Sequence, residues 1–253
     1  MSTFDLFASD TDTEESGDVL PSAGFGPLDT GLYKMGIILA YLSESQNGAH
    51  GLNLHLKNAD GSGPVVRQTL WMTSGKSKGT RNSYIDDNGV KHKLPGMEQA
   101  DNLHALLTGN MMIDAAHSEK TVKLWNPKTS KEENTEVTVI DGLMNQPVLV
   151  GLHKNRDNKM ILNPNKGQPG EKAYVADPSG KDRVYNEINK FFDADTGLTY
   201  AEKKAKVSDP AYLTKWKETF DASYVRDRYK DVGGATAAGN FTAAGTETKS
   251  LFP

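Results

Sequence analysis

The alternation of apolar and polar residues predicts strands in the first third of the chain. Residues 51–57 alternate cleanly, with three leucines facing a core and polar side chains between them. The preceding segment, 32–43, is rich in strand-forming residue types, and its odd-numbered residues from Tyr33 to Tyr41 share one face. An Asn-Gly pair at 47–48 separates the two segments and is a strong hairpin signal.

A third strand is predicted for residues 65–73. One face is apolar, with Val66, Leu70 and Met72, and the other carries Arg67, Thr69, Trp71 and Thr73. A long loop follows, with a small hairpin around the Asp-Asp-Asn-Gly turn at 86–89. An amphipathic helix is then predicted over 97–108 and ends at Gly109; its apolar stripe comprises Met97, Ala100, Leu103 and Leu107.

Strands resume over 120–125, 135–144 and 147–154. Three meandering strands, a helix and further strands are the order of an OB-fold, a five-stranded barrel. Several small β-barrels share this order. We therefore predict a mainly β protein with appended helices, an OB-fold five-stranded barrel with long loop or hairpin insertions, and flexible termini.

The pattern changes after residue 154. Residues 155–182 are rich in loop-forming residues, with a hairpin insertion as one interpretation, whereas 183–193 and 210–230 resemble helices. In the last segment Tyr212, Trp216 and Phe220 form one stripe that is expected to pack on the body. The predicted organisation is a disordered acidic leader over 1–30, an OB-fold domain over 31–231 with a helical extension after about 155, and a flexible tail over 232–253.

Composition supports a chain that is folded only in part. Hydrophobic residues make up 36% of the 253 residues, and 24 Gly and 11 Pro add loop character. The absence of cysteine excludes disulfides, thiolate chemistry and cysteine-zinc sites, and is consistent with a reducing compartment. No signal peptide is visible, and the longest apolar run, 37–42, is far shorter than the about 20 residues of a membrane span. We expect a soluble intracellular protein without a membrane partner.

Charge is unevenly distributed along the chain. The net charge is −4, but residues 1–30 hold seven acids and no Lys or Arg, which leaves +3 for the remainder. The leader is either a solubilising tail or a segment that competes with nucleic acid for a basic groove or recruits basic partners.

Several chemistries are disfavoured. Gly75-Lys76-Ser77 resembles the end of a nucleotide-triphosphate loop, but the first glycine of that motif is replaced by Leu70 and no helix start follows. The six histidines show no metal-ligand spacing. Asp193, Asp195 and Gly197 depart from the calcium-loop pattern and fit a helix-capping turn better. We expect a protein that is not an enzyme and uses no cofactor.

A cluster of cations and planar side chains remains. Six cations lie within residues 65–93 against two acids, with Trp71, Tyr84 and His92 among them. Single-stranded nucleic acid is bound by this mixture, because cations neutralise the backbone and planar rings stack on bases. The predicted nucleic-acid-binding residues are Lys57, Arg67, Trp71, Lys76, Lys78, Arg81, Tyr84, Lys91, His92 and Lys93. The long loop after the third predicted strand is expected to act as a flap over the nucleic acid, with Lys76, Lys78 and Arg81 as mobile cations.

Simpler interpretations stay open. A charged surface loop is usually only solvated, and Trp71 could cap the core. For Tyr33, Tyr41 and Trp125, core packing is at least as good an explanation as contact with bases.

Residues 69–109 also carry a family resemblance, in the Thr73-Ser74-Gly75 run, the Tyr84-Ile85-Asp86 turn and Leu94-Pro95-Gly96 before the helix. Roughly residues 28–155 resemble single-stranded DNA-binding proteins of tailed bacteriophages, particularly N4-like podoviruses. The resemblance implies an OB-fold that coats and protects single-stranded DNA in phage replication and recombination, without catalysis, in the cytoplasm of the infected bacterial host.

The ends of the chain depart from that family. Many of its members end in an acidic tail with an aromatic tip, whereas here Leu251-Phe252-Pro253 follows a segment whose one acid is Glu247. Replication, recombination or transcription proteins are therefore hypothetical partners of either tail. The alternative function is a non-catalytic structural or adaptor phage protein that uses a β-barrel for protein contacts.

Overall fold

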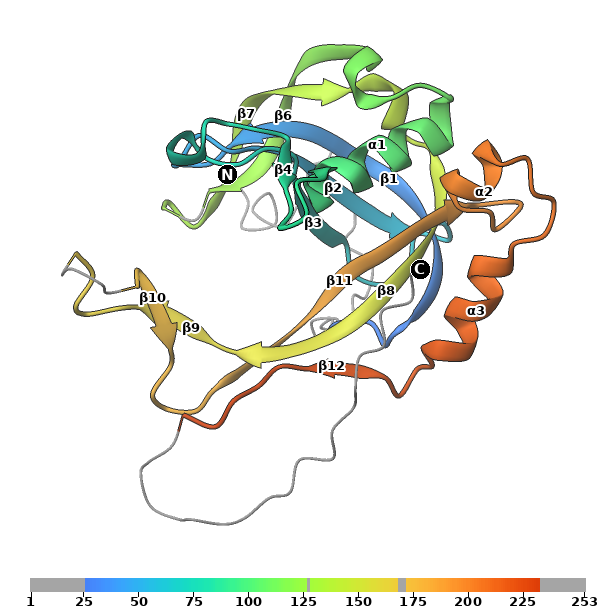
Figure 1. Cartoon of the computed structure of the whole chain (residues 1–253). Helices are drawn as coiled ribbons and strands as arrows, with labels where there is room; N and C mark the ends of the chain where they lie inside the picture. Colours follow the sequence, from blue (N-terminus) through green and yellow to red (C-terminus); the bar gives the residue numbers. More distant parts are fainter. Residues whose placement is uncertain (1–25, 127, 168–171, 233–253) are drawn as a thin grey trace, which may run out of the picture. The chain divides into compact units, whose positions relative to one another are not determined.

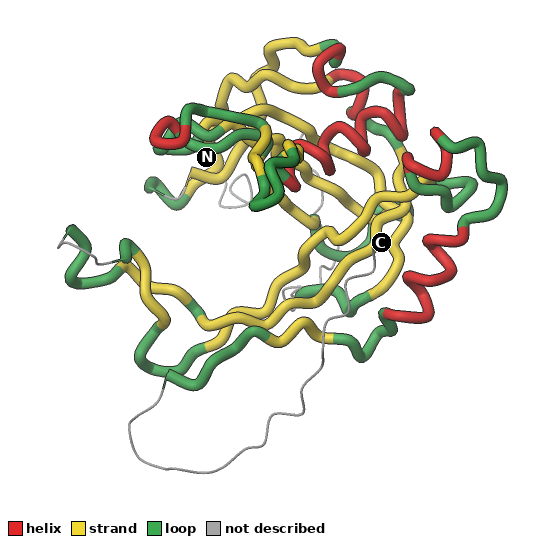
Figure 2. Tube along the Cα trace, viewed as in Figure 1, coloured by secondary structure: helices red, strands yellow, loops and turns green. Residues whose placement is uncertain are grey.

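The computed structural model describes residues 26–126, 128–167 and 172–232, and strands form much of this chain (Figures 1 and 2). The chain divides into two compact units, one formed by Met1–Lys154 with Tyr185–Val225 and the other by Asn155–Val184 with Arg226–Pro253. The acidic leader up to residue 25 and the tail from residue 233, to which partner binding was assigned, lie outside the described residues.

A twisted antiparallel sheet organises the first unit. Its strands are β1 (Gly31–Glu44), β2 (His50–Asn58), β3 (Val66–Trp71), β8 (Pro147–Asn158) and β11 (Asp182–Asp193), paired in the order β11-β8-β1-β2-β3. The mainly β prediction is confirmed. The end strands β3 and β11 are linked by a hydrogen bond of 2.5 Å from the Ile188 amide to the Gln68 side-chain oxygen. Among the described residues no backbone ladder joins these two strands, so pairing alone does not close a barrel.

A β-bulge in β1 changes which residues face the core. The register between β1 and β2 shifts between Ile37 and Leu39. Met35 and Ile37 are fully buried, but after the bulge Ala40 takes the inward position and Tyr41 turns to the other face. The predicted single alternation from Tyr33 to Tyr41 is therefore wrong beyond residue 37, because one extra residue reverses the side-chain direction.

The main core lies on the inner side of the sheet. The predicted inward residues of β2 and β3 are buried, namely Leu52, Leu54, Leu56, Val66, Leu70 and Met72. Helix α1 (Pro95–Thr108) covers them with Ala100, Leu103 and Leu106, and it ends at Gly109 in a left-handed conformation, as predicted. Each fully buried leucine stabilises the fold by about 1.5–3 kcal/mol.

Helix α1 approaches β3 closely at its first turn. A Cβ at Gly96 would lie 2.2 Å from the carbonyl oxygen of Trp71, so only glycine allows this contact. The short hairpin of β4 (Ser83–Ile85) and β5 (Lys91–Lys93) immediately precedes the helix, where a small hairpin was predicted. The first turn of α1 thus packs directly on the end of β3.

A second apolar cluster lies on the outer side of the sheet. Phe192 of β11 packs there with Leu213 and Trp216 of α3 (Ala211–Thr219), and Leu32 and Leu149 pack against them. The prediction of a helix over 183–193 is wrong, because this segment is β11. The spacing of Ile188, Phe191 and Phe192 fits one face of a helix. In the strand, however, Ile188 and Phe191 pack in the main core, and Phe192 packs in the second cluster.

The segment 210–230 is helical only in its first half. After α3 the chain turns at Asp221, whose carboxylate accepts hydrogen bonds from Ser223 and Tyr224, and continues as the strand β12 (Val225–Asp227). The short helix α2 (Tyr200–Lys204) precedes α3 and begins with a capping box between Thr199 and Glu202.

Two further strands form a ribbon beside the sheet. β6 (His117–Asn126) pairs with β7 (Lys131–Ile140) along its full length, and β7 meets β1 at Tyr41 and Val139. The predicted strands in this part of the chain are confirmed, although β6 pairs only with β7 among the described strands.

The second unit contains the hairpin that was one interpretation of residues 155–182. β9 (Met160–Leu162) pairs with β10 (Tyr174–Ala176). Ion pairs hold the unit together: Arg156 binds Asp182 and Asp227, and Arg228 binds Asp157. The ring of Tyr229 lies 4.6 Å from the Arg156 guanidinium, a cation–π contact.

Candidate nucleic-acid interface

The outward side chains of β1, β2 and β3 form a surface that we call the open face. It comprises Tyr41, Asn53, His55, Lys57, Arg67, Thr69 and Trp71. Their positions follow from the strand register, in which Asn53 lies opposite Thr69, His55 opposite Arg67, and Gly51 opposite Trp71. In the described chain neither apolar cluster includes an outward side chain of β2 or β3.

Hydrogen bonds across the strands fix the polar centre of the open face. The Thr69 hydroxyl donates to the Asn53 side-chain oxygen at 2.6 Å, and the Asn53 amide donates to the Ser43 hydroxyl at 2.6 Å. These contacts span all three strands. The flanking aromatic and cationic side chains are therefore presented by a rigid support, which reduces the entropy lost on binding.

Tyr41, His55 and Arg67 interact at one side of this centre. The rings of Tyr41 and His55 meet edge to face, with centroids 5.8 Å apart. Burial and the neighbouring Arg67 charge both lower the pKa of His55 from its usual 6.5. Burial raises the pKa of Tyr41, and Arg67 opposes that change. At neutral pH the cation of this group is Arg67, with two uncharged rings beside it.

Trp71 presents a ring at the end of β3. Its side chain is 46% exposed. Ring atom Cε3 would lie 2.9 Å from a Cβ at Gly51, so the indole lies directly over the Gly51 backbone. A glycine at this position supports one side of the ring and leaves the rest accessible, which is the geometry that base stacking requires.

The loop after Trp71 is held against the β1–β2 turn. The His50 amide donates to the Thr73 hydroxyl at 2.8 Å, and the Lys76 amide donates to the Asn47 carbonyl at 2.7 Å. Lys76 also forms an ion pair with Glu44 at 3.3 Å. Residues 76–78 form a 3₁₀ turn. The expectation of a free flap is therefore wrong, because backbone and side-chain bonds dock the loop on its neighbour.

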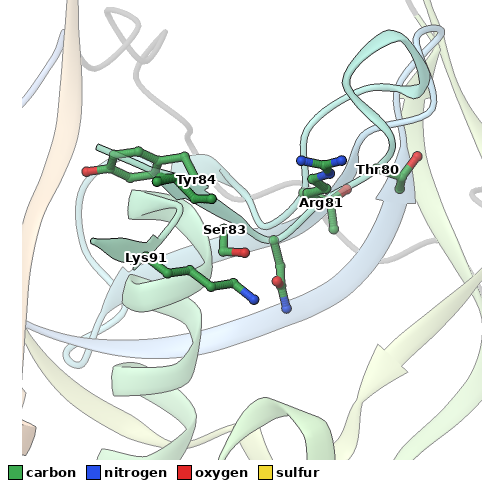
Figure 3. A pocket seen from close by; sticks show the side chains of 8 residues that line it. Thr80, Arg81, Ser83, Tyr84 and Lys91 are labelled. Atoms are coloured by element: carbon green, nitrogen blue, oxygen red, sulfur yellow. The ribbon is translucent and has the colours of Figure 1, made fainter. Parts of the chain in front are cut away.

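Beyond the loop lies an open hollow of about 560 Å³, lined by Thr73, Thr80, Arg81, Asn82, Ser83, Tyr84, Ile85 and Lys91. Figure 3 shows Thr80 and Arg81 at one end and Tyr84 at the other, with Ser83 between them. The cations and hydroxyls around this hollow suit a phosphate group, and Tyr84 supplies a second ring.

Tyr84 is positioned by the β4–β5 hairpin. Its ring stacks on that of His92 at a centroid distance of 5.4 Å, and His92 contacts the Asp86 carboxylate at 3.0 Å. Hydrogen bonds from the Val90 amide and from His92 lower the pKa of Asp86. His92 thus supports Tyr84 and is already engaged with an acid.

The predicted cations divide into two groups. Lys76 is paired with Glu44, and Lys93 with Asp101, which also accepts a hydrogen bond from the Met112 amide. The other five form no ion pair among the described residues, and they are Lys57, Arg67, Lys78, Arg81 and Lys91. Of these five, Lys57 and Arg67 lie on the open face, and Arg81 and Lys91 line the hollow.

Sequence reasoning missed Tyr41 and His55 as members of this surface. The alternation of β2 already placed His55 outward, so its exposure was predictable. The direction of Tyr41 depends on the bulge, which leaves no clear signal in the residue pattern.

The described residues hold neither a cluster of metal-ligand side chains nor a helix that could span a membrane. Among the described residues no group of three or more His, Asp and Glu side chains could hold a metal ion. Burial favours a higher pKa for Asp193, but hydrogen bonds from Lys203 and Thr196 outweigh it and hold that pKa far below its usual value. These bonds form a turn at the end of β11, whereas Thr199 caps helix α2, so the expectation of a helix-capping turn at 193–197 is wrong. Within the described chain no helix is long and apolar enough to cross a membrane.

Comparison with known protein families, curated proteins and solved structures finds no match to this chain. The proposed function therefore rests on the side chains of the open face and of the hollow.

Proposed function

We propose that the protein is a sequence-tolerant single-stranded DNA-binding protein and that the open face is its binding surface. The observation that carries the proposal is Trp71, an exposed indole supported by Gly51 on a hydrogen-bonded sheet that carries the unpaired cation Arg67 on the same face. The ring and the cation together offer a stacking surface and a positive charge. A strand of bases and phosphates satisfies both groups.

The strand arrangement supports an OB-fold as part of this proposal. Taking β8 and β11 as the fourth and fifth strands, the order around the sheet is β1-β2-β3-β11-β8, with α1 between the third and fourth strands. The bond between Gln68 and Ile188 lies at the position where an OB barrel closes. In OB-folds the outer face of strands 2 and 3 binds oligonucleotides, and here that face carries Arg67 and Trp71.

Binding rests on two physical terms. Cations on the open face and around the hollow displace counterions from phosphates, which favours association at low salt. Trp71 and Tyr84 each stack on a base for roughly 1–3 kcal/mol, so two rings supply a large part of a micromolar affinity. Neither term reads base edges, and the protein therefore tolerates any sequence. An extended, coated strand is protected from nucleases and from re-pairing.

The resemblance of residues 28–155 to phage single-stranded DNA-binding proteins extends the proposal to a biological setting. We infer a role in phage DNA replication and recombination in the cytoplasm of the bacterial host, without catalysis. If the protein instead had a structural or adaptor role, the open face would not bind nucleic acid. The following titration distinguishes the two functions.

Titration of the full chain with oligo-dT at increasing salt tests the proposal. If about five phosphates are neutralised, the logarithm of the affinity falls with the logarithm of salt at a slope near −3.5, from about −0.7 per phosphate. Duplex DNA of the same length is the control and should bind much more weakly. A slope near zero, or equal affinity for duplex and single strand, would contradict the proposal; tighter binding of oligo-U would reassign it to RNA.

A further inference from the structure

The β6–β7 ribbon offers a strand edge that no other described strand occupies. β6 pairs with β7 from His117 to Asn126, and its other edge is unpaired among the described strands. A ten-residue edge with free backbone donors and acceptors can add another strand. On one face of β6 every side chain is exposed, and these are His117, Glu119, Thr121, Lys123 and Trp125.

Charge on the ribbon disfavours nucleic acid as the partner. Residues 117–140 contain four acids and four lysines, so the ribbon carries no net charge. A polyanion gains little from a surface without net positive charge. Trp125 is 62% exposed at the far end of β6 and needs an apolar or aromatic neighbour. A strand edge without net charge and with an exposed aromatic ring is suited to pairing with a strand of another protein chain.

The residue order of β6 is complementary to itself. In an antiparallel pair of two β6 strands centred on Thr121, Glu119 of each copy lies opposite Lys123 of the other. The same register places His117 opposite Trp125 and Thr121 opposite its own counterpart. Opposite charges, aromatic pairs and Thr–Thr pairs all stabilise facing positions in antiparallel strands. A twofold axis makes each of the unlike pairs occur twice.

Neighbouring registers lack this match. Centring the pair on Lys120 places two like charges face to face, which is unfavourable. Centring it on Val122 places Glu119 opposite Trp125 and leaves Lys123 opposite Thr121, without an ion pair. Among the described residues Lys123 has no ion pair within its own chain, so its charge is available to the second copy.

We propose that two copies of this chain associate through β6, in an antiparallel register centred on Thr121. The partner is therefore a second copy, and the association continues the sheet from one β6–β7 ribbon into the other. The interface is separate from the open face and does not depend on nucleic-acid binding.

A charge exchange on the full chain tests this interface. Sedimentation equilibrium should give twice the chain mass for the wild-type protein at tens of micromolar. Glu119→Lys alone, or Lys123→Glu alone, places like charges opposite each other at two sites and should yield monomers. The double variant Glu119→Lys/Lys123→Glu restores the opposite charges and should restore the dimer. Glu136→Lys on β7 makes the same charge change away from the edge and should stay dimeric.

Any of three results would overturn the proposal: a monomeric wild type, a dimer that survives both single reversals, or a double variant that stays monomeric. Circular dichroism confirms that each variant is folded. The cysteine-free sequence allows a second test. Thr121→Cys should form a disulfide-linked dimer on mild oxidation, whereas Thr135→Cys on β7 should not; equal crosslinking of both variants also contradicts the register.

Discussion

The sheet of the first unit has two outer regions, and a tryptophan lies on a glycine in each. Trp216 lies over Gly151 of β8, and Trp71 lies over Gly51 of β2. Trp216 is 3% exposed, stacks on His153 and Phe220, and donates its Nε1–H to Asn189. Trp71 is 46% exposed, and its partner across the strands is Gly51.

The same local arrangement therefore serves two purposes. A helix, α3, covers the first tryptophan, and aromatic neighbours complete its surroundings. On the open face the strand-to-strand hydrogen bonds organise the surface, but the ring is left partly uncovered. The difference indicates that Trp216 stabilises the fold, whereas Trp71 is free to stack on a ligand. Five predictions test this difference.

The largest effect is expected for Trp216→Ala. Loss of a buried indole and its hydrogen bond should lower the free energy of unfolding by about 3–5 kcal/mol. Urea denaturation followed by circular dichroism measures this change. Trp71→Ala, which removes a half-exposed indole, is the matched control and should change stability by less than about 1 kcal/mol. Similar values for both variants would remove the distinction between covered and uncovered tryptophans.

Trp71→Ala should weaken DNA binding and leave the stability of the fold almost unchanged, the reverse of Trp216→Ala. We expect a loss of about 2 kcal/mol in binding to oligo-dT, or about 30-fold in affinity, with little change in stability. Fluorescence anisotropy of labelled oligo-dT measures the affinity. Tyr212→Ala removes a partly exposed ring on α3 and should bind as the wild type does. An unchanged affinity for Trp71→Ala would exclude this ring as a stacking platform.

Gly51→Ala tests the support beneath Trp71 while keeping the ring. The new methyl group would lie 2.9 Å from the indole and 2.7 Å from the Thr69 methyl, so both side chains must move. We expect about a fivefold loss of oligo-dT affinity, from about 1 kcal/mol of misplacement. Gly36→Ala on β1, where a Cβ has no atom within 4 Å, is the control. Equal affinities for the two variants would show that the ring position is unimportant.

The two lysines of the docked loop, Lys76 and Lys78, should contribute differently to the salt dependence of oligo-dT binding. Lys78→Ala removes an unpaired cation and should reduce the salt slope by about 0.7, whereas Lys76→Ala should reduce it less because Glu44 already neutralises that charge. Glu44→Gln should in turn steepen the slope by releasing Lys76. Salt titrations of the three variants decide the point, and identical slopes for the two lysine variants would show that the ion pair is broken on binding.

The smallest expected effect is the pH dependence of oligo-dT affinity that arises from His55. The folded-state pKa of His55 is lowered by burial and Arg67, so its neutral form stabilises the fold above pH 6.5 and that contribution is lost as the pH falls. A phosphate on the open face would raise this pKa, and binding would take up a proton. We expect oligo-dT affinity to rise about two- to threefold from about pH 7.5 to 5.5 in excess of that of His55→Gln. If the oligo-dT affinities of the wild type and of His55→Gln changed equally with pH, the bound phosphates would not lie near His55.

Much of the first half of the fold was predictable. The inward leucines of β2, the apolar face of β3, the small hairpin and the end of α1 at Gly109 follow from periodicity and turn residues, because these signals are local. The cations and rings of residues 65–93 were also visible as a cluster. Their roles were not, since the ion pairs of Lys76 with Glu44, His92 with Asp86 and Lys93 with Asp101 depend on how the loop, the hairpin and α1 are arranged in space.

By itself, the sequence determined a mainly β chain, a strand with a Trp and an Arg on its polar face, and the absence of thiol chemistry. Only the tertiary structure decided that 183–193 is a strand, because its apolar spacing fits a helix and a two-sided strand equally, and pairing with β8 favours the strand. It also decided, through one bulge in β1, that Tyr41 faces outward, and, through the packing of α3, that Trp216 is covered. These outcomes depend on contacts between distant segments, which no local pattern encodes.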